Sequence, residues 1–129
     1  MMEILKKKNA PRYIRKEGIK SYLLASPITC NSNNLTTTLV EIEPGGKQRV
    51  HKHEPEQVYF IIDGMGEMTV GNEHQIVSCE DCIFIPSDEP HGLENIGEST
   101  LKYFSTASPS FTEKELNNFW PIESESTKK

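Results

Sequence analysis

The chain contains a succession of short segments rich in β-branched and aromatic residues, each ended by turn-forming residues such as Pro44-Gly45-Gly46 and Asp63-Gly64. Segments of about five to nine residues, with turn signals about every eight to twelve residues, are typical of all-β sandwiches and barrels. The predicted strands are residues 35–43, 48–53, 57–63, 65–70, 74–78, 81–85, 91–96 and 100–106.

Only the C-terminal end of the chain has a helical pattern. Thr112 is followed three residues later by Glu115, as in a capping box, and Pro121 would end the element. This pattern predicts a helix at about 112–120. Residues 19–25 form one more short apolar run, which we place as an extra strand at a sheet edge. No long linker divides the chain, so we predict one domain over 1–129, with a core barrel at about 35–106 and an N-terminal arm at 1–30.

The composition limits the classes of partner. Fourteen Lys and Arg stand against 19 Asp and Glu, a net charge of −5 over 129 residues. Nucleic-acid binding requires a clustered basic face, so we expect no nucleic-acid partner. The longest apolar run is residues 58–62, whereas a membrane-spanning helix needs about 20 apolar residues, so we expect no membrane insertion.

The cysteines indicate a reducing compartment. The chain has three cysteines and no apolar stretch behind its N-terminal lysines that would form a secretory signal. We therefore predict a cytoplasmic location. Cys79 and Cys82 have a C-x-x-C spacing, but they lead into a predicted strand and lack a second pair of ligands. We interpret them as partly buried thiols.

Three of the four histidines lie beside turns of the strand series. His51 and His53 are separated by Lys52, and residues i and i+2 of a strand point to the same face. Two imidazoles on one face can bind one transition metal, although a pair of solvated surface histidines has the same pattern. His91 lies five residues after Pro86, and His74 is expected to be a solvated residue of a hairpin arm.

The spacing around these histidines resembles the two signature motifs of the cupin superfamily. The first motif is matched by Gly45, His51, His53, Gln57 and Gly64. The second motif is matched by Pro86, His91 and Asn95. The resemblance covers residues 45–95, and the flanking strands extend it to nearly the whole chain.

The resemblance implies a double-stranded β-helix, the jelly-roll barrel of cupins, that holds one divalent transition metal. Iron, manganese, nickel, copper or zinc would be bound by His51, His53, Gln57 and His91. Cupins usually have glutamate where this chain has Gln57, and a neutral carboxamide is a weaker donor, so metal affinity should be lower. Where the second motif has glycines, this chain has Glu80 and Asp88, and aspartate tolerates the left-handed backbone of a turn.

Two further residues are candidate catalytic groups. Glu56 directly precedes Gln57 and would reach the metal only if a bulge turned it inward. Tyr59 shares the strand face of Gln57, where it would either orient a substrate or pack in the barrel. Asn95 is expected to hold a turn through side-chain hydrogen bonds rather than to take part in catalysis.

The resemblance implies a metalloenzyme that acts on a small oxygenated molecule by dioxygen insertion, decarboxylation, isomerisation or cyclisation. The alternatives are a non-catalytic barrel that binds or senses a small ligand or the metal, and histidines that line a ligand pocket without a metal. One fold hosts many chemistries, so the motifs do not choose among them. Small cupins commonly pair through exposed sheet edges, so we expect a homodimer in which residues 5–25 cover such an edge.

Overall fold

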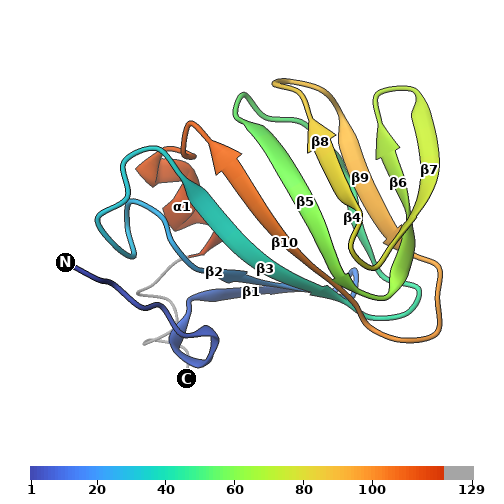
Figure 1. Ribbon diagram of the computed structural model, residues 1–129, viewed down its shortest axis with the longest axis horizontal. Helices are drawn as coiled ribbons and strands as arrows, with labels where there is room; N and C mark the ends of the chain where they lie inside the picture. Colours follow the sequence, from blue (N-terminus) through green and yellow to red (C-terminus); the bar gives the residue numbers. More distant parts are fainter. Residues whose placement is uncertain (121–129) are drawn as a thin grey trace.

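Two antiparallel sheets face each other and a short helix follows them in the computed structural model, which describes residues 1–120 (Figure 1). The six-stranded sheet has the order β1 (Arg12–Arg15), β2 (Ile19–Leu23), β3 (Thr36–Ile42), β10 (Leu101–Ser108), β5 (Glu56–Asp63), β8 (Cys82–Ile85). The four-stranded sheet has the order β4 (Lys47–His51), β9 (His91–Asn95), β6 (Met65–Val70), β7 (Glu73–Ser78). The predicted all-β jelly-roll architecture is confirmed.

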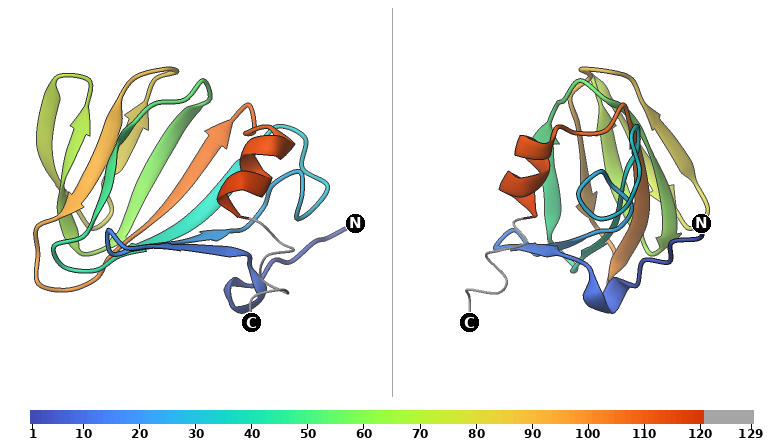
Figure 2. Two further views of the ribbon diagram at one scale, coloured as in Figure 1. Left: turned by 180° about the vertical axis from the view of Figure 1, so that it is seen from behind. Right: turned by 90° about the vertical axis from the view of Figure 1, so that its left-hand side faces the viewer.

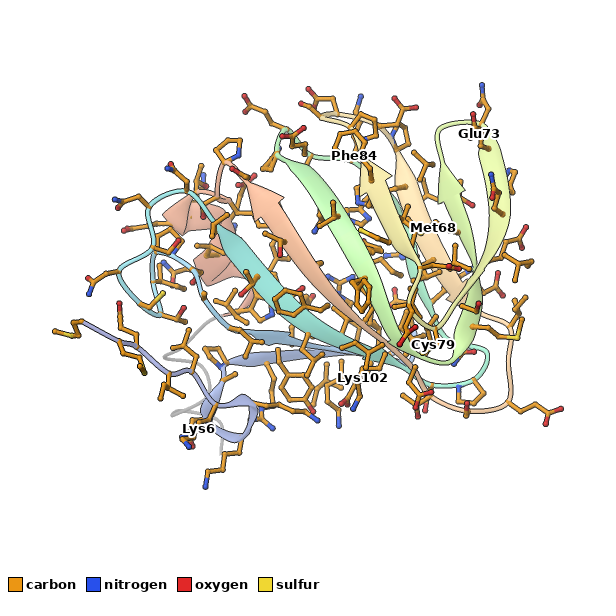
Figure 3. The ribbon with its side chains drawn as sticks, viewed as in Figure 1. Lys6, Met68, Glu73, Cys79, Phe84 and Lys102 are labelled. Carbon is orange, nitrogen blue, oxygen red and sulfur yellow. The ribbon has the colours of Figure 1, made fainter. Side chains whose placement is uncertain are left out.

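The core lies between the two sheets and follows from the period-two pattern of the strands. In β10 the residues Leu101, Tyr103, Ser105 and Ala107 are buried, and each alternates with a more exposed neighbour. Met68 of β6, labelled in Figure 3, belongs to the same apolar cluster from the opposite sheet. Burial of one face of each sheet against the other therefore fixes which side chains point into the barrel.

The N-terminal arm differs from the prediction. The run at 19–25 is present as β2, but it lies between β1 and β3 rather than at an edge, and β1 takes the edge position. No strand was predicted at β1, because Arg12 and Arg15 interrupt any apolar alternation. Its inward Tyr13 pairs with Ser21 of β2, so tertiary pairing forms this strand.

Two turns confirm the interpretation of the altered motif positions. Asp88 has φ 61° and Glu80 has φ 75°, both in the left-handed region that favours glycine. Gly64, which ends β5, has φ 89°, and a Cβ there would lie 2.8 Å from the carbonyl oxygen of Thr100. Cys79 and Cys82 flank the turn at Glu80, and both side chains are exposed rather than partly buried.

The helix α1 (Glu113–Phe119) lies at the end of the molecule away from the β6–β7 hairpin (Figures 1 and 2). Its predicted capping box is present, since Thr112 accepts a hydrogen bond from the Glu115 backbone and the Glu115 side chain accepts one from Thr112. Leu116 is fully buried and packs in a second apolar cluster with Leu23 and Trp120. Pro121, predicted to end the helix, lies outside the described residues. Among those residues, no helix is long and apolar enough to cross a membrane.

Candidate metal centre

The three motif histidines come from two neighbouring strands of one sheet. His51 is the last residue of β4 and pairs with His91, the first residue of β9. The β4–β9 register shifts between Gln48 and His51, which indicates a bulge. The predicted strand at 48–53 is therefore too long, and His53 lies in the loop that leads to Pro55, a residue that cannot donate to a strand ladder.

The imidazole rings nevertheless converge. The ring centroids of His51 and His91 are 4.4 Å apart, those of His53 and His91 are 4.8 Å apart, and those of His51 and His53 are 5.5 Å apart. One ring nitrogen from each histidine lies within 4.8 Å of the others. This separation suits three ligands around one ion. His74, the fourth histidine, is exposed on β7 and contacts Thr69.

Backbone carbonyls fix the orientation of all three rings. The Nδ1 atoms of His51, His53 and His91 lie 2.9, 3.0 and 2.9 Å from the carbonyl oxygens of Arg49, Pro55 and Glu89. In each ring Nδ1–H therefore donates to a carbonyl, and Nε2 is the nitrogen left for a ligand. Hydrogen bonding of the second ring nitrogen to a carbonyl or carboxylate is characteristic of metal-binding histidines.

The buried ring nitrogen of His91 is the strongest indication that these histidines can hold a cation. The His91 side chain is fully buried, and within residues 1–120 its Nε2 has no hydrogen-bond partner. Burial lowers the pKa of His91 to about 4, and burial also lowers the pKa of His51, although that residue is more exposed. Both rings are thus neutral at neutral pH. A buried polar nitrogen without a partner is costly, and a bound cation would remove that cost.

Gln57 brings a fourth donor from the other sheet. Its side chain is buried, and its Nε2 donates to the Ser105 hydroxyl at 3.3 Å, which turns Oε1 toward the histidines. Oε1 lies 3.0 Å from His53 Nε2. These two atoms face each other beside the other imidazoles, so one cation could bind both.

The donor set fits a divalent transition metal. Three imidazole nitrogens and one amide oxygen are ligands that such ions accept. The buried Nε2 of His91 lies beside the ring nitrogens of His51 and His53. The set carries no negative charge, so the bound ion would retain its full charge.

Tyr59 and Glu56 lie on opposite faces of β5. Tyr59 is buried, its ring is 6.0 Å from that of His91, and it stacks on Tyr103 at 4.3 Å. Burial raises the pKa of Tyr59 to about 12, so its phenol stays protonated. Glu56 is exposed, and the β5–β10 register is regular at this point, so no bulge turns its carboxylate inward.

His51 and His53 line a cavity of about 780 Å³, and Gln57 and Tyr59 line it too. Segments outside the two motifs form much of its wall, and sequence reasoning assigned them no role in the site: Tyr13 and Arg15 of β1, and Phe111, Phe119 and Trp120 around α1. Asn95, which follows His91 on β9, is buried and binds the carbonyls of Ile42 and Ser99, as expected for a structural residue.

The comparisons with known proteins agree with this geometry. The family model described as the cupin domain matches residues 38–107. An uncharacterized protein of Methanocaldococcus jannaschii is 34% identical over 106 residues, which cover 80% of this chain and 83% of that protein. An oxalate-binding protein of Thermotoga maritima is 28% identical over 86 residues, covering 66% of this chain and 70% of that protein. A solved structure of Bacillus subtilis oxalate decarboxylase, an enzyme with Mn(II) centres, superposes on this chain with a TM-score of 0.69 at 25% identity. The match covers 78% of this chain and 28% of that chain.

Proposed function

The chain belongs to the cupin family, and from that premise we propose that it is a metal-dependent enzyme acting on a small oxygenated molecule. The proposal assigns His51, His53, His91 and Gln57 as ligands of one divalent ion. The observation that carries it is the buried, unpartnered Nε2 of His91 beside two further imidazole nitrogens. The reaction classes are those open to such a centre: dioxygen insertion, decarboxylation, isomerisation or cyclisation.

The ion would supply Lewis-acid activation of a chelating oxygen, and the protein would supply orientation and a restricted environment. The Nδ1 hydrogen bonds to three carbonyls hold the imidazoles ready, so little reorganisation accompanies binding. Tyr59, which is protonated and lies near His91, can donate its hydroxyl proton in a hydrogen bond to a substrate oxygen. We assign no catalytic role to Glu56, because its carboxylate faces solvent.

Manganese is the first ion to test, because the Bacillus subtilis oxalate decarboxylase contains Mn(II). Iron, nickel, copper and zinc are the alternatives. Purified protein would be analysed for metals, reloaded with each ion, and assayed with enolic and catecholic compounds and oxalate, both in air and without oxygen. We expect about one ion per chain, with turnover that disappears after chelation. Protein that retains no metal would overturn the proposal.

The second candidate function is a non-catalytic ligand-binding protein. It is favoured because the carboxylates that line the cavity already take part in other interactions. Of the residues lining the cavity, Glu17 pairs with Arg49 at 3.1 Å and Glu115 belongs to the capping box of α1, so neither is free as an acid–base group. The related Thermotoga protein is named for oxalate binding rather than turnover. Tight binding of an assay compound by metal-loaded protein, with no product formed, would support this candidate.

We also propose that the chain forms a homodimer. Residues 5–25, which we expected to cover a sheet edge in the dimer, pair within the chain through β1 and β2, so we place the contact on the outer face of the six-stranded sheet. There Phe60 pairs with Phe104 and Val58 pairs with Phe84, and the side chains of Phe60 and Phe84 are 42% and 56% exposed. An exposed apolar patch of this kind is typical of an interaction surface.

Sedimentation equilibrium tests the homodimer. We expect twice the chain mass of 14.6 kDa for the wild type and a monomer for Phe84→Glu. The control, Ile76→Glu, changes an equally exposed residue of the four-stranded sheet and should remain a dimer. A monomeric wild type would refute the proposal.

A further inference from the structure

Arg15 places a positive charge in the wall of the metal cavity. It lies on β1 with its side chain on the same face as Tyr13, because β1 pairs Tyr13 with Ser21 and Arg15 with Ile19, both of which point inward from β2. It lines the same cavity as His51, Tyr59 and Tyr103. Arg15 therefore lies close enough to influence the groups around the proposed ion.

The guanidinium of Arg15 has few partners for a half-buried cation. Its Nη1 is 3.5 Å from Gln48 Oε1, at the limit of a hydrogen bond, and its charge lies 4.6 Å from the centre of the Tyr13 ring. Within residues 1–120 no carboxylate lies within ion-pair distance of it. A guanidinium has five N–H donors in a planar fork that matches a carboxylate. Most of these donors are available to a ligand in the cavity.

Aromatic rings form the adjoining wall. The Tyr13 and Phe119 rings are 6.4 Å apart, and the Phe119 and Trp120 rings are 5.9 Å apart. Phe111 contacts His53 edge-on at 5.0 Å, so this aromatic wall continues to the metal ligands. The whole cavity measures about 780 Å³, whereas pockets of about 300–1,000 Å³ hold drug-sized ligands. A two-carbon diacid such as oxalate would leave most of this space to water.

From these features we propose that the substrate is an organic acid with a planar unsaturated body, its carboxylate bound by Arg15 and its body packed against the aromatic wall of Tyr13, Phe111, Phe119 and Trp120. This inference rests on the proposed function, since it identifies the substrate class of that same site. Arg15 acts in it as a specificity-determining residue.

Calorimetric titration with cinnamate, cinnamamide and acrylate tests the proposal. Cinnamamide has the ring of cinnamate without the charge, and acrylate has the carboxylate without the ring. Because charge-assisted hydrogen bonds are about twice as strong as neutral ones, we expect cinnamate to bind at least about tenfold more tightly than cinnamamide. Acrylate, which cannot contact the aromatic wall, should also bind at least about tenfold more weakly than cinnamate. Equal affinities, or no binding of cinnamate at millimolar concentration, would overturn the proposal.

Variants assign the preference to Arg15. Arg15→Met should remove the preference for cinnamate over cinnamamide, and Arg15→Lys should retain part of it. Lys20→Met is the matched control, because it removes a cation from the outer face of the neighbouring strand, and it should leave the preference intact. Circular dichroism checks that each variant is folded. An Arg15→Met variant that still prefers the acid would refute the assignment.

The titrations are run on manganese-loaded and on metal-free protein. The two conditions distinguish an error in the substrate assignment from an error in the proposed metal centre. A carboxylate held by Arg15 should keep its advantage over the amide without the ion. If the protein binds metal but shows no Arg15-dependent preference, only the substrate assignment fails. If it binds no metal yet shows that preference, only the proposed metal centre fails. A preference that depends on the metal and not on Arg15 contradicts the role of Arg15.

Discussion

The chemistry of the site depends on the local contacts of a few side chains. The motif spacing predicted the convergence of His51, His53 and His91, and the structure brings them together. Sequence could not predict that the Nδ1 atoms of His51 and His53 would meet a carbonyl two residues away, because the β4 bulge and the loop after it set that geometry. The sequence also could not show which face of its strand the Glu56 side chain points to, because that depends on the strand register, which the pairing of β5 with β10 sets.

Loss of one imidazole should remove the ion without unfolding the chain. His53 lies in a loop outside the main apolar cluster, so His53→Ala should fold normally but lose stoichiometric metal, as measured by elemental analysis after dialysis. His74→Ala removes an exposed histidine distant from the centre and should retain the metal. Full metal content in His53→Ala would show that His53 is not a ligand.

Restoring a carboxylate should tighten metal binding. In Gln57→Glu a neutral oxygen donor becomes anionic close to the ion, and we expect the metal dissociation constant to fall by about tenfold or more. Competition with a chromogenic chelator measures this constant. Glu56→Gln changes the charge of the exposed neighbour and should leave the constant unchanged. An unaltered constant in Gln57→Glu would mean that this side chain does not contact the ion.

At the level of elements, all eight motif-region strands and the helix were predictable, because their turn residues and capping box are local signals. The edge strand β1 could not be predicted, because it has only four residues and its formation depends on pairing with β2. Because β1 was not predicted, Arg15 was not among the site residues expected from the sequence. The structure buries Trp120, which follows the helix, and also places it in the cavity wall.

Close packing between β6 and β9 should make Gly66 sensitive to substitution. A Cβ at Gly66 would lie 2.5 Å from the carbonyl oxygen of Glu94 on β9, the strand that carries His91. Gly66→Ala should therefore lower the free energy of unfolding by about 1–3 kcal/mol in urea denaturation. A Cβ at Gly97 would meet mainly the flexible side chain of Met65, so Gly97→Ala should change the free energy of unfolding by no more than about 0.5 kcal/mol. Equal stabilities for the two variants would contradict this packing.

At the scale of the whole molecule, the proposed centre joins the two sheets. His51 and His91 belong to the four-stranded sheet, and Gln57 belongs to the six-stranded sheet. The terminal segments then close the cavity from outside the family motifs. The matched barrel would thus supply the ligands, while segments outside the matched residues shape the space in which a substrate would bind.

An ion that links both sheets should stabilise the entire fold. A ligand that binds only the folded state at 100 times its dissociation constant raises the free energy of unfolding by about 2.7 kcal/mol. We therefore expect manganese to raise the melting temperature of chelator-treated wild type in calorimetry and to have no effect on His53→Ala. A similar rise in both proteins would indicate that the ion binds elsewhere.

The most direct measurement is anomalous X-ray diffraction, at the manganese absorption edge, from crystals of protein loaded with manganese. The account predicts one strong anomalous peak within bonding distance of the Nε2 atoms of His51, His53 and His91 and of Oε1 of Gln57. An anomalous map without a peak among these side chains, or with the three rings turned apart, would contradict it.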